Sequence, residues 1–395
     1  MNVRELAEKY ERYVIEQRRW FHSHPELAWK EEETTEHIVW ELEAMQIEVN
    51  RFEGHTGCWA MIYGGKAGVE PKTILLRADI DALPTVEKSD VTYKSIYEGR
   101  MHACGHDAHA AMLLGAAKIL KESEAQLEGN VKLLFQAAEE TAIGAKYYVD
   151  QGITSDVLAV YGCHVATWLD APLLDINTGA REPSCDEFEI TVRGKAAHGG
   201  IPQDGHDAIV AASAIVLNLQ TLVSRINDPR NPLVVTVGQM EGGYQYNIIA
   251  GKATLHGTVR TFSAEFRKEL IGKMREMAEA SAKAYGCEAK LDYMWKTGPV
   301  FNKDETLNEV VRKAAETLYG KEGIHNLEAV SMSDDFAYFA EEVPGFFAFI
   351  GARNAEKNCV FPHHHECFDI DEDVLKRGTA LFAQVSMDFL KTVRE

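Results

Sequence analysis

Residues able to hold metal ions gather in a few short segments of this sequence. The densest is MHACGHDAH at 101–109; an adjacent Glu139-Glu140 pair, His164 and an HHHE run at 363–366 stand further along the chain. Thiolate, imidazole and carboxylate groups together suit a borderline divalent ion such as Zn, Mn, Co or Ni. Because five or six donors exceed what one tetrahedral ion needs, we expect two ions, ~3.5–4 Å apart, that acidify a bridging water and polarise a carbonyl group.

Hydrolysis at such a site also needs a general base, usually a carboxylate beside the metal. The Glu139-Glu140 pair offers one carboxylate as a ligand and its neighbour as the base. Each segment alone has an ordinary explanation: paired glutamates are usually solvated, a lone His164 is usually structural, and Cys104 could be a small buried apolar residue. The metal site is favoured because these ordinary explanations would require metal-capable residues to occur by chance in all of these segments.

The elements that must position these residues form an alternating pattern. Strand-like apolar runs stand at 73–78, 131–136, 157–162 and 346–351, among helical patterns at 2–20, 31–45, 107–122, 304–319 and 372–393. This alternation predicts an α/β fold with a largely parallel sheet covered on both faces. Open sheets of this kind bind ligands beyond the carboxyl ends of their strands. The candidate residues follow the strand runs, as do Asp79 and Asp81, so we expect them at one edge of the sheet.

The middle of the chain has a different pattern. Strand-like segments at 187–194, 232–240, 252–262 and 288–295 enclose helical segments at 205–225 and 264–285. The order β-α-β-β-α-β is the ferredoxin-like pattern. We therefore predict a catalytic domain made of residues 1–184 and 297–395, interrupted by an inserted domain of residues 185–296.

Charge and composition exclude several classes of partner. Lys and Arg total 41 against 61 Asp and Glu, a formal charge of −20, which disfavours nucleic acid. The sequence contains no run of 18 apolar residues, so we expect no membrane span, and the charged N-terminus lacks a signal-peptide pattern. Seven widely spaced cysteines indicate reduced thiols in a cytoplasmic enzyme. The H-E-x-x-H, P-C-x-x-C and G-x-S-x-G motifs of other hydrolases are absent.

A family resemblance covers nearly the whole chain. It is carried, in order, by RRWFHSHPEL, LLRADIDALP, GRMHACGHDAHAAMLLGAAKIL, FQAAEE, GCHV, GKAAHGGIPQDGHDAI, NIIAGKATLHGTVRTF, SDDFAYF, PGFFAFIGAR and HHHECFDIDED. These segments resemble the amidohydrolase branch of the aminoacylase/carboxypeptidase-G-type metallopeptidases, peptidase family M20. That branch includes hippurate hydrolases, N-acyl-amino-acid deacetylases and plant auxin-conjugate hydrolases.

The resemblance implies a ligand set for two divalent ions per subunit, Zn or Mn foremost. The residues at the matching positions are Cys104, His106, Glu140, His164 and His364. Among the three adjacent histidines, the family frame H-x-x-x-F-x-[IL]-D-E selects His364. Glu139 matches the general acid/base, which would activate the metal-bridging water.

The resemblance also implies roles for the inserted domain, as a lid and a dimerisation domain. His198 matches a histidine that stabilises the oxyanion, often in the partner subunit, and Asn247 and Arg260 match residues that hold a substrate carboxylate. The chain departs from the family pattern at Ala250, Glu366 and Cys367, which affects the pocket wall and not a ligand.

The predicted activity is hydrolysis of N-acyl amino acids or similar small amides by a homodimer or higher homo-oligomer. Two alternatives stay open. One is a dipeptidase or aminopeptidase of the same superfamily, and the other is a non-catalytic metal-binding protein, which the presence of Glu139 disfavours.

Overall fold

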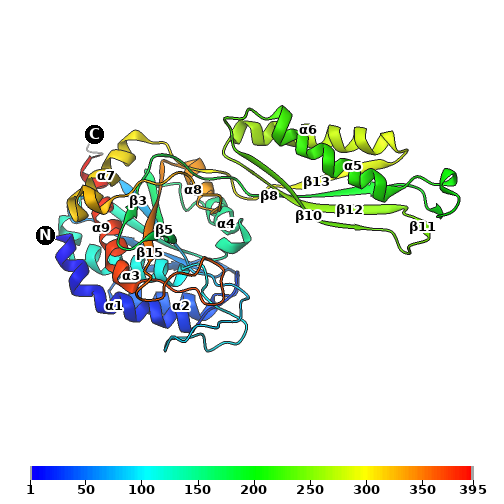
Figure 1. The fold of residues 1–395 in the computed structure, drawn as a ribbon. Helices are drawn as coiled ribbons and strands as arrows, with labels where there is room; N and C mark the ends of the chain where they lie inside the picture. The colour runs from blue at the N-terminus through cyan, green and yellow to red at the C-terminus, as the bar shows by residue number, and fades with distance from the viewer. Residues whose placement is uncertain (1, 393–395) are drawn as a thin grey trace. The chain divides into compact units, whose positions relative to one another are not determined.

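The computed structural model describes residues 2–392 as two compact units (Figure 1). The first unit runs from the N-terminal helix to Arg181 and includes 301–329 and the chain from Asp334 onward. The second unit comprises Glu182–Val300 together with Val330–Ser333. The short 330–333 segment, expected in the catalytic domain, groups with the second unit, where Arg260 donates hydrogen bonds to the Ser333 hydroxyl and the Ser331 carbonyl.

The sheet of the first unit is parallel at its centre and antiparallel at its edges. Strand β3 lies between β4 and β5, and β15 follows β5, all in parallel register. Strands β2 and β1 extend one edge and β6 the other, all antiparallel. The order across the sheet is β1 (Val49–Arg51), β2 (Cys58–Ile62), β4 (Asn130–Gln136), β3 (Thr73–Asp79), β5 (Ala159–Asp170), β15 (Gly345–Arg353) and β6 (Leu174–Asp175).

Helices cover this sheet. Its central strands β3 and β4 are buried along their whole length, which explains their continuous apolar runs. The helices of this unit are α1 (Val3–Ser23), α2 (Glu32–Ala44), α3 (His106–Glu122), α4 (Gly144–Asp150), α7 (Glu305–Tyr319), α8 (Ala337–Glu342) and α9 (Leu375–Thr392). Helix α3 packs against α1 and α9, and a side chain at its Gly115 would lie 2.5 Å from Val14 and 2.9 Å from Thr379. The Ala-rich sequence of α3 therefore serves close helix packing beside the sheet.

The second unit is a four-stranded antiparallel sheet with two helices. It contains β8 (Asp186–Arg193), α5 (Ala208–Thr221), β10 (Leu233–Gly242), β12 (Lys252–Thr261), α6 (Ala264–Ala284) and β13 (Glu288–Met294), with the strand order β10-β12-β8-β13. Both helices pack into one apolar core with the strands. In β8 the inward residues Phe188, Ile190 and Val192 are buried and alternate with more exposed ones. The predicted ferredoxin-like arrangement is thus confirmed.

Helix α5 continues into a π-helical turn, Leu222–Ile226, and the combined stretch is strongly apolar. Within residues 2–392, Ala208–Ile226 is the one helical stretch whose length and composition alone would allow it to cross a membrane. One side of it belongs to the core of the second unit, whereas Val210 and Leu217 on another side are 46% and 71% exposed.

Most helices and strands lie at the residues predicted for them, and the differences concern the length of β5 and three edge strands. Strand β5 continues through His164 to Asp170 because β15 pairs with it beyond the apolar run. The edge strands β1, β2 and β6 were not predicted. They are short, and β1 and β6 owe their place to pairing with neighbouring strands more than to any local pattern.

Candidate metal centre

One cluster in the first unit contains all five predicted metal ligands and the predicted base. Among the described residues, ligand atoms within 4.8 Å of one another occur in five groups, and three overlapping groups consist only of predicted residues: Cys104, His106 and His164; Cys104, Glu140 and His364; His106, Glu139 and Glu140. Cys104 belongs to the first two groups and therefore links them. The residues come from the loop before α3, the start of α3, the turn after β4, strand β5 and the loop after β15.

Two buried polar atoms in the cluster have no hydrogen-bond partner among the described residues. They are Nε2 of His106 and Oε1 of Glu140. The other ring nitrogen of His106 is occupied, because it donates to the Asp81 carbonyl at 2.9 Å. His164 likewise donates from Nδ1 to the Val165 carbonyl, so its Nε2 lies free to face Cys104 Sγ at 3.5 Å. A buried polar atom without a partner is costly, and a divalent ion would satisfy both atoms, so the residues fit a metal.

The electrostatic environment favours neutral imidazoles at two of the ligands. Burial lowers the pKa of His164 well below its ordinary value, and neighbouring His109 lowers it further. Burial also lowers the pKa of His364, aided by His106. A neutral imidazole has the lone pair that a metal ligand needs.

The acidic ligands carry raised pKa values. Burial raises the pKa of the Cys104 thiol well above its usual range, and the nearby Glu140 carboxylate adds to the effect. Burial raises the pKa of Glu140 to about 7, although His106 opposes the shift. In His106 burial is outweighed by Asp79 and Cys104, so its pKa is raised. A divalent ion would have to displace protons from these groups.

Glu139 lies beside the ligands in a crowded acidic environment. Burial raises its pKa well above the ordinary value, and Asp334, Asp335 and Glu140 raise it further. Its Oε2 is 3.8 Å from His106 Nε2, and its Oε1 accepts a weak 3.4 Å hydrogen bond from the Asp335 amide. A carboxyl group with a raised pKa can both accept and return a proton near neutral pH.

Left-handed backbone conformations occur at the turns that present these side chains. Ala138, directly before Glu139, has φ = +61°, and His364 has φ = +64°. Such conformations are costly for residues other than glycine and cluster at functional sites. The His364 amide donates to the Ala103 carbonyl at 2.7 Å, which ties its loop to the Cys104 segment. This geometry brings His364 close to Cys104 and Glu140.

Two further histidines support the cluster without offering a free nitrogen. His363 donates from Nδ1 to the Cys104 carbonyl at 3.0 Å and accepts from the Thr167 amide at 3.3 Å. His109 lies 2.5 Å from Asp79 through Nδ1 and accepts from the Val165 amide at 2.9 Å. Sequence reasoning assigned them no role, and only their place beside the ligands in MHACGHDAH and the HHHE run pointed to them.

A buried arginine lies behind Glu139. The Arg77 guanidinium donates to Asp79 at 2.7 Å, to Asp334 at 3.2 Å and to Asp335 at 2.9 Å, and all four side chains are buried. The aspartates belong to the SDDFAYF segment and to the end of β3. Sequence reasoning missed this group, because a lone arginine inside an apolar strand gives no indication of its partners.

The second unit contains the remaining predicted site residues, two of them at a two-stranded ribbon and the third on strand β12 of its four-stranded sheet. His198 pairs with Ile248 in a two-stranded ribbon, and the Gly199 amide donates to the Asn247 carbonyl, so His198 and Asn247 are neighbours. Arg260 lies near the far end of β12, which begins at Lys252. Arg260 stands eight residues after Lys252, about 27 Å along the strand at ~3.4 Å per residue. Arg260 is thus remote from the end of β12 that follows the Asn247 segment.

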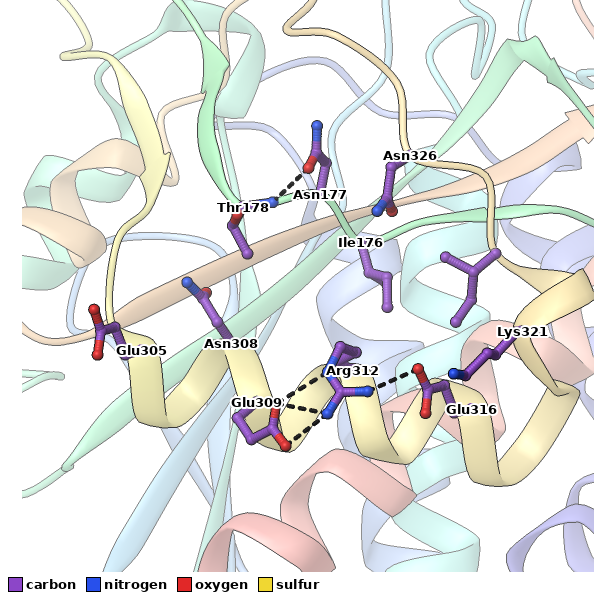
Figure 2. Close-up of a pocket in the computed structure, with 11 residues that line it drawn as sticks. Ile176, Asn177, Thr178, Glu305, Asn308, Glu309, Arg312, Glu316, Lys321 and Asn326 are labelled. Carbon is purple, nitrogen blue, oxygen red and sulfur yellow. Dashed lines mark hydrogen bonds and ion pairs between the residues drawn. The ribbon is translucent and has the colours of Figure 1, made fainter.

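A hollow elsewhere on the first unit contains none of the predicted site residues. Figure 2 shows it between the 176–178 segment and helix α7. Its one arginine, Arg312, is already paired with Glu309 and Glu316. None of the residues that line this hollow is a predicted metal ligand or the predicted base, so we consider the cluster around Cys104 as the catalytic site.

Comparison with known proteins identifies the family. Residues 75–388 match the model of peptidase family M20/M25/M40. The chain is 36% identical over 382 residues to N-acetylcysteine deacetylase of Bacillus subtilis, covering 96% of this chain and 98% of the relative. It is 34% identical over 381 residues to IAA-amino acid hydrolase ILR1-like 4 of Arabidopsis thaliana, covering 96% and 86%.

A solved structure agrees with these relatives. The YXEP protein of Bacillus subtilis, a dinuclear metal-binding peptidase of the M20 family, superposes with a TM-score of 0.86. It is 34% identical, and the match covers 98% of this chain and all of that one. The predicted family, the α/β fold and a site for two divalent ions are thereby confirmed. This chain belongs to peptidase family M20/M25/M40 and is a metal-dependent amidohydrolase that acts on linear amides.

Proposed function

We propose that this enzyme hydrolyses the amide bond of N-acyl amino acids, with Cys104, His106, Glu140, His164 and His364 as the ligands of its two metal ions. The observation that carries the proposal is the set of overlapping donor groups that joins these five residues, with Glu139 in the group of His106 and Glu140. The two curated relatives support the substrate class, since their names concern N-acetylcysteine and IAA-amino acids.

The mechanism follows from the residues of the cluster. Two divalent ions held there would supply an acidified water and a Lewis acid for the amide carbonyl. Glu139 would accept a proton from the attacking water and return it to the leaving nitrogen, a transfer for which its raised pKa suits it. The mixed thiolate, imidazole and carboxylate donors favour Zn or Mn as the native ion.

The second unit would serve as a lid that completes the site. His198 would stabilise the oxyanion, and Arg260 or Asn247 would bind the α-carboxylate of the substrate. Because Arg260 lies about 27 Å along β12 from Lys252, the end of the strand next to the ribbon of His198, the two ends would serve different active sites. In a pair of chains, each active site could take Arg260 from one chain and His198 from the other.

A homodimer through the second unit agrees with its surface. Helix α5 exposes Val210 and Leu217, and strand β10 pairs with β12 and leaves its other edge open among the described residues. Open strand edges and exposed apolar stripes are typical of protein interfaces. We propose a cytoplasmic enzyme, since all seven cysteines are free thiols.

The test is a turnover screen of the metal-reconstituted protein. The panel contains N-acetyl and N-benzoyl amino acids, the same N-acyl compounds with the α-carboxylate replaced by a carboxamide, and free dipeptides. We expect hydrolysis of the N-acyl amino acids, with much lower kcat/KM for the amides because Arg260 or Asn247 then has no partner. A preference for free dipeptides would contradict the proposal and favour a dipeptidase.

The matched variant is Glu139→Gln, which keeps the size of the side chain. It should bind both ions yet lose roughly 10²–10⁴-fold in kcat, the usual contribution of a general acid/base. Near-normal turnover by this variant would remove Glu139 from the mechanism.

A further inference from the structure

The turn that presents Glu139 and Glu140 is held by two buried carboxylates. The Ala138 amide donates to Oε1 of Glu31 at 2.9 Å. The next two amides, those of Glu139 and Glu140, donate to the two carboxylate oxygens of Asp81 at 3.1 and 3.0 Å. Three consecutive backbone N–H groups are therefore fixed by acceptors from two distant segments.

This turn needs such support because its backbone is strained. Ala138 has φ = +61°, and Ala142, at the other end of the turn Glu139–Thr141, has φ = +57°. Alanine pays a cost in this region that glycine does not, so the surrounding contacts must hold it there. A hydrogen bond to the Ala138 amide acts directly on the strained peptide.

The side chain of Glu31 does not stabilise the helix that follows it. It stands at the N-cap position of α2, yet its side chain makes no capping hydrogen bond. Glu26 bonds the first turn instead, because its Oε2 accepts from the Thr34 amide at 2.8 Å. The Glu31 side chain is thus free to point away from α2 toward Ala138.

The carboxylate of Glu31 is itself rigidly held. It is fully buried, and its Oε2 accepts from the Thr56 hydroxyl at 2.5 Å. Tyr148 joins the same two segments, since its hydroxyl donates to the Thr56 carbonyl at 2.9 Å and accepts from the Ala137 amide at 3.0 Å. Glu31 forms no ion pair with a basic side chain among the described residues, so a simple ion pair does not explain its burial.

We propose that Glu31 is a positioning residue of the active site: by binding the Ala138 amide it orients Glu139 as the base and Glu140 as the metal ligand. The inference rests on the proposed function for the roles of these two glutamates. Residues that orient metal ligands from behind typically contribute about 10–100-fold to metal affinity or activity.

The test compares three variants. Glu31→Met fills the same volume without an acceptor, Glu31→Gln keeps an oxygen that can accept from Ala138, and Glu26→Ala disturbs the same end of α2 without touching the turn. For each, Zn²⁺ affinity is measured by calorimetric titration of the metal-free protein, and kcat and KM are measured with the best substrate of the parent enzyme.

We expect Glu31→Met to lose about 10–100-fold in affinity for one Zn²⁺ ion and in kcat, with little change in KM. Glu31→Gln should recover most of both quantities, and Glu26→Ala should retain both. Parent-like values for Glu31→Met, or equal losses in Glu26→Ala, would overturn the proposal. If Glu31→Met does not fold, Thr56→Val replaces it: a smaller loss of the same kind supports the role, and parent-like values overturn it.

The two proposals fail in different ways. Absence of N-acyl amino acid hydrolysis by the parent protein would reject the proposed substrate class. The Zn²⁺ titration requires no substrate and would still report whether Glu31 orients Glu140.

Discussion

At the scale of single residues, the metal centre holds protons that a divalent ion must displace. Burial raises the pKa of Glu140 to about 7 and that of the Cys104 thiol well above its usual value. The pKa of His106 is also raised, since Asp79 and Cys104 outweigh the effect of its burial. Below about pH 7 the metal-free site is therefore protonated at several ligand atoms, and protons compete with the ion.

The first prediction concerns pH. Because Glu140 loses its proton only above about pH 7, Zn²⁺ affinity should increase from pH 6 to pH 8, and binding should release protons. Calorimetry in two buffers of different ionisation enthalpy measures the number released. Glu140→Gln should release fewer protons, while the surface variant Glu124→Gln should match the parent. An affinity independent of pH would contradict the prediction.

The second prediction concerns Cys104, which two of the ligand groups share, the group with His106 and His164 and the group with Glu140 and His364. Cys104→Ala should lose at least one metal ion per chain, because Cys104 contributes to both groups. Elemental analysis after dialysis measures the metal content. Cys58→Ala, which removes a buried thiol from strand β2, provides the control and should keep both ions. Two tightly bound ions in Cys104→Ala would exclude it as a ligand.

At the scale of elements, the Arg77 group joins strand β3 to the segment before α8. Its three aspartate partners are fully buried with it, and Gln136 at the end of β4 accepts from the same guanidinium at 2.7 Å. Burial raises the pKa of Asp335 to about 8, with Asp334 adding to the shift and Arg77 opposing it. The arginine therefore offsets the mutual repulsion of carboxylates directly behind Glu139.

The third prediction follows from that burial. Arg77→Leu should lower the free energy of unfolding by about 3–5 kcal/mol, since it leaves buried carboxylates without their cation. Arg312→Leu is the matched control, because its ion pairs on α7 are about half exposed and should contribute less than ~1 kcal/mol. Urea unfolding of both variants measures the difference. Equal losses would show that the Arg77 group has no special role in stability.

At the scale of the whole molecule, the catalytic centre and the lid residues belong to separate compact units. His198 lies in the two-stranded ribbon next to the Lys252 end of β12, and Arg260 lies toward the other end of that strand, so we propose that they serve different active sites. A symmetric pair of chains allows this, because each lid then contributes one end to each site.

The fourth prediction tests this arrangement with mixed dimers. Neither His198→Ala nor Glu139→Gln homodimers should be active. A dimer with one chain of each kind, isolated with two affinity tags, should regain about half of the parent activity, because one of its two sites is intact. An inactive mixed dimer would mean that His198 serves its own chain.

The sequence by itself determined the α/β fold, the inserted ferredoxin-like unit and the ligand types, because strand periodicity and the MHACGHDAH segment are local features. Tertiary structure decided what depends on contacts between distant segments. Only the folded chain brings Glu31 to Ala138, across 107 residues, and surrounds Arg77 with Asp334 and Asp335. It also places Arg260 far along β12 from the end that follows the Asn247 segment, because a strand fixes its residues at a set rise. Pairings of this kind leave no periodic trace in the sequence, since nothing local distinguishes these residues from the solvent-facing charges of an ordinary helix or turn.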